Sequence, residues 1–489
     1  MDSDESTFLQ KIQDTSRNSH ECLSEREIQR AKVILNDAQC GVRILDEDAR
    51  AHLRIALAPH RRLPTEILAQ IFVESAEDYF PHDLSVSPWA LRSVCSRWRT
   101  ISLNDIRLWR RLTISNTYNA YSNECRLSFP LSFILDHLIP SEGPFSISLS
   151  AHNAWKTMEA MIIPNLPRMI ELSLSIDDIF DLLHLITNPE FRIPEVVALE
   201  FRILPGFPVL PSGLSATGNV IAERGLMTAQ KLRKLELSCA GFEEICRALL
   251  LLDFPWAQLV ELDINNFNTN VLYTLNVLNQ CQNLEKLSLS FTQRHSQPQP
   301  SQGVVQLALR PMTLPHLTFM ELTDAEDHVL SFFIVPALIE LVVDSKYLPV
   351  NEVIGLITKS RCKISIFRHP RPATYLFFAR QLIEVLPHVK VLICTPGLMQ
   401  PEDLRDIGSG ILLPYVKVLH CTARSPHAFL KMVEALVSLA RSEENKIGGK
   451  LRKAETQNWE ESQEYGAIFE RLGEINRENG TLFTMRQVR

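Results

Sequence analysis

Apolar residues at every second position recur along the chain from about residue 144 onward. The fullest copies combine an apolar-Pro-x-apolar start with an alternating strand, as in LPRMIELSL at residues 166–174. The central apolar residues of the clear copies are Leu172, Leu199, Leu235, Leu262, Leu287, Met320, Leu341, Leu392 and Leu419. The steps between them are 27, 36, 27, 25, 33, 21, 51 and 27 residues. Ile366 would divide the longest step into 25 and 26, and Ile147 would add an earlier copy. Alternation of this kind predicts strands that bury one face.

Between the copies, apolar residues at helical spacing predict helices at 179–186, 242–252, 271–278, 353–357, 375–385 and 429–439. Such a strand and such a helix each bury one side only, so neither is stable until neighbouring copies stack. One strand and one helix per copy resembles a leucine-rich repeat, although its usual asparagine is missing here. The resemblance implies that residues 144–442 form a solenoid with parallel strands on its concave face. Unrelated β/α units in a doubly wound sheet are the alternative, but the recurring proline and the near-constant step favour the repeat.

Helical spacing also marks the first part of the chain. Residues 1–22 are polar with few large apolar groups, and we expect them to be disordered. Ser24 and Glu27 form a capping-box pattern that predicts a helix start. Gly41 interrupts a helical segment that we place at 23–59. Its apolar positions are Ile28, Ala31, Ile34, Leu35, Val42, Leu45, Ala49, Leu53 and Leu57. A helical pair packed on its own neighbour is favoured over a coiled coil, because three clean heptads are not present.

Residues 60–113 carry the densest motif of the chain. It reads LPTEILAQIF at 63–72, ALRSVCSRWR at 90–99 and LW at 108–109. Proline is tolerated at the first position of a helix, so Pro64 predicts a helix start. One face of that helix would carry Ile67, Leu68, Ile71 and Phe72. A second helix would carry Leu91, Val94, Cys95 and Trp98 on one side, and a third would carry Ile106 and Trp109.

This order of motifs resembles the F-box, in the form found in large fungal families. The resemblance implies docking on the Skp adaptor of a cullin–RING ubiquitin ligase. The residues that it implies at the adaptor are Leu63, Pro64, Ile67, Leu68 and Ile71, with Val94 and Trp98 reaching the interface. The main role of four residues would be to hold the three helices together: Phe72, Val94, Cys95 and Trp98. The long loop 75–88 departs from the usual pattern and affects the detailed adaptor contacts. The alternative is an ordinary three-helix segment packed into its own protein.

Polar residues that alternate with the buried leucines would point to the concave face of the predicted sheet. Acids outnumber bases among them, and the last two copies offer Val391, Ile393, Val418 and His420 instead. A solvated sheet face is the simpler interpretation. The sharper hypothesis is a target with a basic and an apolar part. The candidate target-binding residues are Glu171, Glu200, Arg202, Glu236, Glu261, Asp263, Glu321 and Glu340.

Composition narrows the function classes. The 489 residues carry a net charge of −7, which does not favour nucleic acid as a partner. The ten cysteines are scattered without a CxxC pair, as suits a reducing compartment, and the acidic N-terminus does not resemble a secretory signal. No apolar run reaches the roughly 20 residues of a membrane span. Phosphate-binding, nucleophile-elbow and zinc-protease motifs are missing from the sequence, so we expect no metal, no cofactor and no catalytic site.

We therefore expect an α+β protein: an all-α F-box unit at 60–113, a connector at 114–143, the repeat array at 144–442, and a charged tail at 443–489. A helix in that tail, carrying Tyr465, Ile468, Leu472 and Ile475, would cap the array. The predicted function is a cytoplasmic or nuclear substrate receptor of a ubiquitin ligase, with a Skp-type adaptor, a cullin and an unknown target protein as partners. A scaffold outside a ligase is the alternative, and an enzyme with a hidden site is weaker still.

Overall fold

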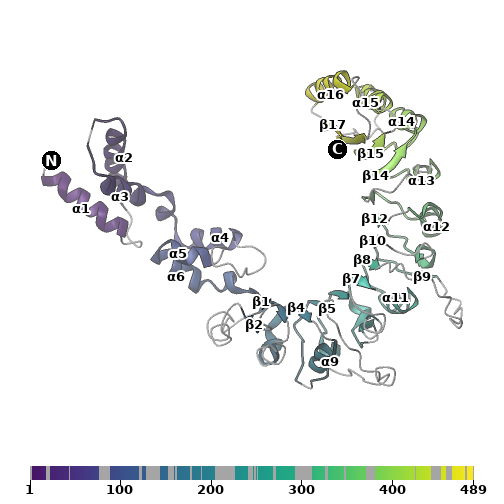
Figure 1. Cartoon of the computed structure of the whole chain (residues 1–489), viewed down its shortest axis with the longest axis horizontal. Helices are drawn as coiled ribbons and strands as arrows, with labels where there is room; N and C mark the ends of the chain where they lie inside the picture. The colour runs from purple at the N-terminus through teal and green to yellow at the C-terminus, as the bar shows by residue number, and fades with distance from the viewer. Residues whose placement is uncertain are drawn as a thin grey trace. The chain divides into compact units, whose positions relative to one another are not determined.

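Figure 1 shows the computed structural model of the chain, which divides into a first unit, Met1–Leu174, and a second unit, Ser175–Arg489. The residues described are 3–17, 23–42, 44–75, 89–119, 124–127, 144–151, 159, 162–176, 179–188, 190–203, 226–239, 246, 249–250, 252–267, 271–291, 311–324, 329–345, 348–370, 380–423, 426–441, 453–458, 465–479 and 482–487.

The first unit begins with three helices that share one core: α1 (Ser3–Arg17), α2 (Glu25–Gln39) and α3 (Glu47–Leu57). The core side chains are Phe8, Ile12, Leu23, Ile28, Ala31, Ile34, Ala38, Leu45, Leu53 and Ala56. The disorder expected for residues 1–22 is therefore wrong for Ser3–Arg17. The reason is that Phe8 and Ile12, four positions apart, form an apolar stripe despite the polar composition around them. Residues 18–22 lie outside the described residues.

Local contacts explain where these helices begin and end. The Glu27 carboxylate accepts hydrogen bonds from the Ser24 backbone N–H (2.8 Å) and hydroxyl (2.7 Å), so the predicted capping box is present. Gly41 follows α2 with a φ of +72°, which glycine adopts without steric cost. The apolar period from Val42 does not begin a helix at once: Val42 lies between α2 and α3 and is 79% exposed. Instead α3 starts after Asp46, whose side chain accepts from the Ala49 N–H.

Helices η1 (Pro59–Arg62), α4 (Thr65–Ser75), α5 (Trp89–Val94), α6 (Ser96–Asn104) and η2 (Ile106–Trp109) follow in the first unit. Pro64 does not occupy the first helical position. Its carbonyl accepts the first hydrogen bond of α4, from the Leu68 N–H at 3.0 Å, so it lies one residue before the helix. The expected third helix is the short 3₁₀ turn η2.

Strands begin earlier than the repeat pattern predicted. The first unit contains β1 (Arg111–Asn119), β2 (Glu124–Leu127) and β3 (Phe145–Ala151) in the order β3-β1-β2. β1 runs parallel to β3, with Leu112 opposite Ile147, and antiparallel to β2. The expected connector 114–143 is corrected accordingly, because part of it is β1 and β2, while 120–123 and 128–143 lie outside the described residues.

The second unit is built on a sheet in which each strand lies beside its successor. Its strands, after β4 (Met169–Ile176) at the division, are β5 (Ala198–Ile203), β6 (Lys234–Cys239), β7 (Glu261–Phe267), β8 (Lys286–Phe291), β10 (Phe319–Thr323), β12 (Glu340–Asp344), β13 (Ile366–His369), β14 (Val391–Met399), β15 (Val418–Ala423), β16 (Lys453–Asn458) and β17 (Leu482–Gln487). The pairings recorded from β5 to β17 are parallel. Two further strands, β9 (Met312–Thr313) and β11 (Phe333–Ile334), pair with each other.

The register follows the leucine pattern. Leu199, Leu235, Leu262, Leu287, Met320 and Leu341 lie opposite one another in turn. The degenerate copy is shifted by one residue, because Phe367 rather than Ile366 pairs with Leu341 and Leu392 and is fully buried. A one-residue shift exchanges the two faces of a strand.

The predicted tail contributes more than a cap. The tail helix α16 (Tyr465–Asn479) forms, with Ile468, Leu472 and Ile475 buried, but β16 and β17 also continue the sheet. These two strands were not predicted.

Helices lie along one side of this sheet in Figure 1. They are α9 (Ile179–Thr187), α11 (Val271–Leu278), α12 (Val350–Ser360), α13 (Arg380–Glu384), α14 (Pro401–Gly408), α15 (Pro426–Arg441) and α16. Helix α14 was not predicted. Its last residue, Gly408, approaches α15 closely: a Cβ there would lie 3.1 Å from the Cα of Met432. Most of the helix expected at 242–252, and residues 375–379 of another, lie outside the described residues.

Backbone hydrogen bonds explain why the copies stack. The Val197 carbonyl accepts from the N–H groups of both Arg233 (2.8 Å) and Lys234 (3.0 Å) in the next copy. The same paired contact recurs at Arg233, Val260, Glu285, Thr318, Ile339, Ser365 and Lys390. Before the strands, turns such as Leu386 C=O to Val389 N–H close at 3.2 Å, and proline suits their second position. A carbonyl ladder therefore joins successive copies at the strand starts.

Candidate functional site

Helix α4 presents its apolar residues to two different surroundings. Leu68 and Phe72 are each 1% exposed, whereas Ile67 is 49% and Ile71 46% exposed. The Phe72 ring packs on Trp98 of α6 with ring centroids 4.7 Å apart. The two residue pairs, each spaced four apart, therefore form a core stripe and an outward stripe on one helix.

The burial corrects one of the expected adaptor contacts. Leu68 faces the interior of its own domain, because the i, i+4 spacing with Phe72 carries it into the core. Leu63 and Trp98 are half-buried. Val94, which ends α5, is 53% exposed and stays available.

An exposed apolar edge remains at the start of α4. We define it as Pro64, Ile67 and Ile71, all of which are exposed, and call it the apolar edge. Isoleucine and proline side chains at such an edge lose contact with water when a partner covers them, and this transfer is the main favourable term of association. The edge can bind an apolar partner surface, and it carries no group that could perform chemistry.

The residues before the apolar edge are held by arginine side chains that the sequence analysis did not select. Arg97 of α6 donates to the carbonyls of Arg61 (2.8 Å) and Leu63 (2.6 Å). The Cys95 thiol caps the same helix by accepting from the Trp98 N–H at 3.5 Å. Bonds from a side chain to distant backbone carbonyls leave no periodic trace in a sequence, which is why the pattern could not reveal them.

Comparison with known families decides the nature of this part of the chain. Residues 60–115 match the F-box-like family model. They form an F-box-like domain. F-box domains generally bind Skp-type adaptors, and the match covers the predicted 60–113 almost unchanged. No curated protein matches the chain.

The polar face of the sheet in the second unit is the other candidate. Glu200, Glu236 and Asp263 lie opposite one another on β5, β6 and β7. The row continues through Ser288 to Glu321 on β8 and β10. We call Glu200, Glu236, Asp263 and Glu321 the acidic row.

Crowding and partial burial affect the protonation of these carboxylates. Burial, and then the neighbouring charges of Glu200 and Asp263, raise the pKa of Glu236 above its ordinary value. Burial also raises the pKa of Asp263, and burial with the charges of Asp263 and Asp344 raises that of Glu321. A cation placed on the row would relieve this repulsion.

Cations of the same face compensate part of the row. Arg202 pairs with Glu200 at 2.6 Å and lies 3.8 Å from Glu236. In the adjacent row Glu261 pairs with Lys286. Glu340 of that adjacent row pairs at 3.1 Å with Arg368, which lies in line with Glu321 and Val342 of the acidic row's register. Arg368 was missed, because the register of β13 was assigned one residue away.

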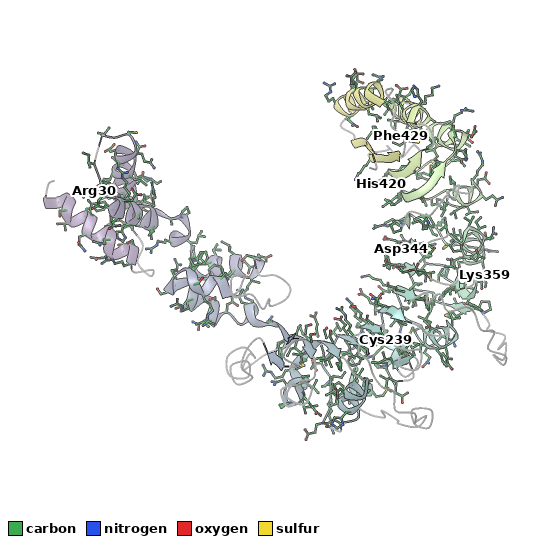
Figure 2. The ribbon with its side chains drawn as sticks, in the orientation of Figure 1. Arg30, Cys239, Asp344, Lys359, His420 and Phe429 are labelled. Carbon is green, nitrogen blue, oxygen red and sulfur yellow. The ribbon has the colours of Figure 1, made fainter. Side chains whose placement is uncertain are left out.

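The structure thus gathers most of the predicted target-binding residues on one face. Glu171 lies on β4 and is half-buried. Val391 and Ile393 of β14 lie opposite Val418 and His420 of β15, so a less charged area continues the face. In Figure 2, Asp344 and His420 lie on the side of the sheet away from the helices, while Lys359 lies on the helix side.

Within the residues that the structure describes, no group of three or more His, Cys, Asp or Glu side chains is placed to hold a metal ion. No helix in the described ranges combines the length and apolar character that crossing a membrane requires.

Proposed function

We propose that the protein is a substrate-recognition subunit of an SCF-type cullin–RING ubiquitin ligase. The F-box-like domain would bind a Skp-type adaptor, and through it a cullin, by the apolar edge with Val94 and Trp98. The observation that carries the proposal is an F-box-like domain in which Ile67 and Ile71 stay about half exposed. Catalysis would belong to other subunits, and the assembly would work in the cytoplasm or nucleus.

Energetic considerations support adaptor binding by this edge. Full burial of a large aliphatic side chain contributes roughly 1.5–3 kcal/mol, so a half-exposed isoleucine gains about 1 kcal/mol on being covered. Several such anchors, among them Val94, which is 53% exposed, are needed to offset the several kcal/mol that association costs. The small edge therefore suits an interface that also includes the half-buried Leu63 and Trp98.

Within the same proposal, the second unit is a degenerate leucine-rich-repeat array of the fungal F-box type that selects the target. Its support is the recurring strand register and the carbonyl ladder between copies. The acidic row and its neighbours Arg202, Glu261 and Glu340 would contact a basic part of the target, and Glu171 of the first unit stays a predicted contact. The area around Val391 and Ile393 would contact an apolar part.

Purification from cells tests the adaptor part of the proposal. The full chain should retain a Skp-type adaptor and a cullin, and Leu63→Ala/Pro64→Ala should lose both. Retention of the adaptor without a cullin would instead favour a scaffold outside a ligase. Retention of neither by the wild-type chain would refute the proposal.

A charge-reversal experiment tests the target part separately. Glu236→Lys/Glu261→Lys should reduce recovery of the target, identified by proximity labelling with the proteasome inhibited, and leave adaptor binding unchanged. Glu190→Lys/Glu402→Lys, which reverses two exposed acids outside the strands, is the control matched for charge. Unchanged target recovery in the Glu236→Lys/Glu261→Lys variant would rule out this face.

A further inference from the structure

A buried arginine connects the N-terminal bundle to the start of the F-box-like domain. Arg61 is 7% exposed, and its guanidinium donates to the carbonyls of Thr15 and Ser16, the latter at 2.7 Å. Thr15 and Ser16 belong to the last turn of α1, where helix carbonyls have no partner within the helix. A cation at this end also complements the helix dipole. Arg61 therefore caps α1 from a position just before α4.

A second arginine holds the backbone on both sides of Arg62. Arg97 of α6 donates to the carbonyls of Arg61 and Leu63, so α1, the segment 61–63 and α6 form one continuous chain of hydrogen bonds. Pro64 and the first hydrogen bond of α4 follow directly. The path of the backbone into the apolar edge is thus set by contacts from two other helices.

The carbonyl partners of Arg61 and Arg97 indicate a positioning role. Both guanidinium groups bind backbone carbonyls here. A planar guanidinium holds two carbonyls from two nitrogens in a fixed fork, a geometry that the single nitrogen of an ammonium group does not reproduce. A buried cation is costly unless its donors are used, so the site is stable only with the carbonyls in place. The Ser16 hydroxyl also lies 2.6 Å from Nδ1 of His52 on α3, which ties the same helix end to the bundle.

We propose that Arg61 and Arg97 are positioning residues that make the α1–α3 bundle part of the adaptor-docking unit. They preorganise the apolar edge, and preorganisation raises affinity by reducing the ordering that a partner must impose. The inference rests on the proposed adaptor binding. It extends the docking unit from residues 60–115 back to α1.

Lysine substitutions test the positioning role in the full chain, because they keep the charge and remove the guanidinium fork that holds two carbonyls. Arg97→Lys should raise the dissociation constant for purified Skp-type adaptor roughly tenfold, as loss of one charge-assisted hydrogen bond implies. Backbone amides of 65–72 should exchange hydrogen faster in the free protein. Arg99→Lys is the control on the same helix, since Arg99 binds a single carbonyl, that of Arg92. It should change neither quantity.

Hydrogen exchange is measured without adaptor, so it tests the positioning role of Arg97 independently of adaptor binding. If the wild-type chain does not bind the adaptor, the proposed function fails, and faster exchange at 65–72 in Arg97→Lys still supports the positioning role. Unchanged exchange and unchanged affinity would overturn the inference. Should Arg97→Lys unfold the domain, Arg61→Lys decides, because it leaves the Arg97 contacts in place. Faster exchange at 65–72 is expected there too, and exchange like that of the wild type would overturn the inference.

Discussion

We expect opposite effects from substitutions in the two stripes of helix α4: the core stripe should affect folding stability, and the outward stripe should affect adaptor binding. Truncation of Leu68, which is 1% exposed, removes buried carbons and leaves a cavity. Such changes cost about 2–5 kcal/mol of folding free energy. That is a large share of the roughly 5–15 kcal/mol by which small domains are stable. Leu68→Ala should therefore loosen α4 and its contacts with α6.

The outward stripe should respond differently. Isoleucine to alanine removes three carbons, worth about 0.8 kcal/mol each when fully buried, and Ile67 and Ile71 are about half exposed already. Covering each would contribute about 1 kcal/mol. Ile67→Ala/Ile71→Ala should thus weaken adaptor binding by about 2 kcal/mol, or roughly thirtyfold in the dissociation constant.

Titration calorimetry with purified Skp-type adaptor measures the affinity, and hydrogen exchange at 65–75 measures local stability in the full chain. The double variant should lose affinity while its exchange stays close to that of the wild type. Leu68→Ala should accelerate exchange before any adaptor is added. The assignment of the two stripes would be contradicted if the double variant bound as well as the wild type, or if Leu68→Ala left exchange unchanged.

Three further predictions concern packing, pH and thiol chemistry. Gly408→Ala should destabilise the second unit by about 1–3 kcal/mol, because the new Cβ meets backbone atoms of α15. Gly355→Ala in α12, where nothing lies within 4 Å, should instead add up to about 1 kcal/mol; urea unfolding of both variants compares them, and equal shifts would contradict the packing argument. Hydrogen bonds from Lys11 and Ser24 lower the pKa of Glu27 from 4.5 to about 2. A depressed pKa stabilises the fold above the unfolded value and not below the folded one, so the stability of the α1–α3 bundle should decline as pH falls from about 5 to 2. Glu27→Gln should flatten that decline in circular dichroism titrations, and an unaltered slope would contradict it. Burial raises the pKa of Cys421 to about 12, so iodoacetamide at pH 8 should label the exposed Cys40 and spare Cys421 until the chain unfolds, as mass spectrometry can show. Labelling of Cys421 in the folded chain would refute this.

Patterns that depend on local spacing were visible in the sequence. Alternation around Leu199, Leu235 and Leu262 predicted strands whose register the structure confirms, because a period of two assigns each side chain to one face. The F-box-like motif was likewise readable, since its helix start and apolar spacing lie within a few dozen residues. Acids on the polar face followed from the same alternation.

Tertiary structure decided the remaining features. Burial alone distinguishes Leu68 from Ile67, two adjacent aliphatic residues of which only Leu68 shares the core stripe with Phe72, whose ring packs on Trp98 of α6. The polar strand β16 forms because its neighbours on both sides supply backbone hydrogen bonds. Its own sequence has no apolar alternation that would predict a strand. Arg61 and Arg97 bind carbonyls 34 to 46 residues away, and backbone carbonyls are identical at every position. Hydrophobic periodicity therefore determined the strands of the leucine pattern and the helices of the F-box-like domain, whereas the contacts that choose between core and surface arose only when distant segments met.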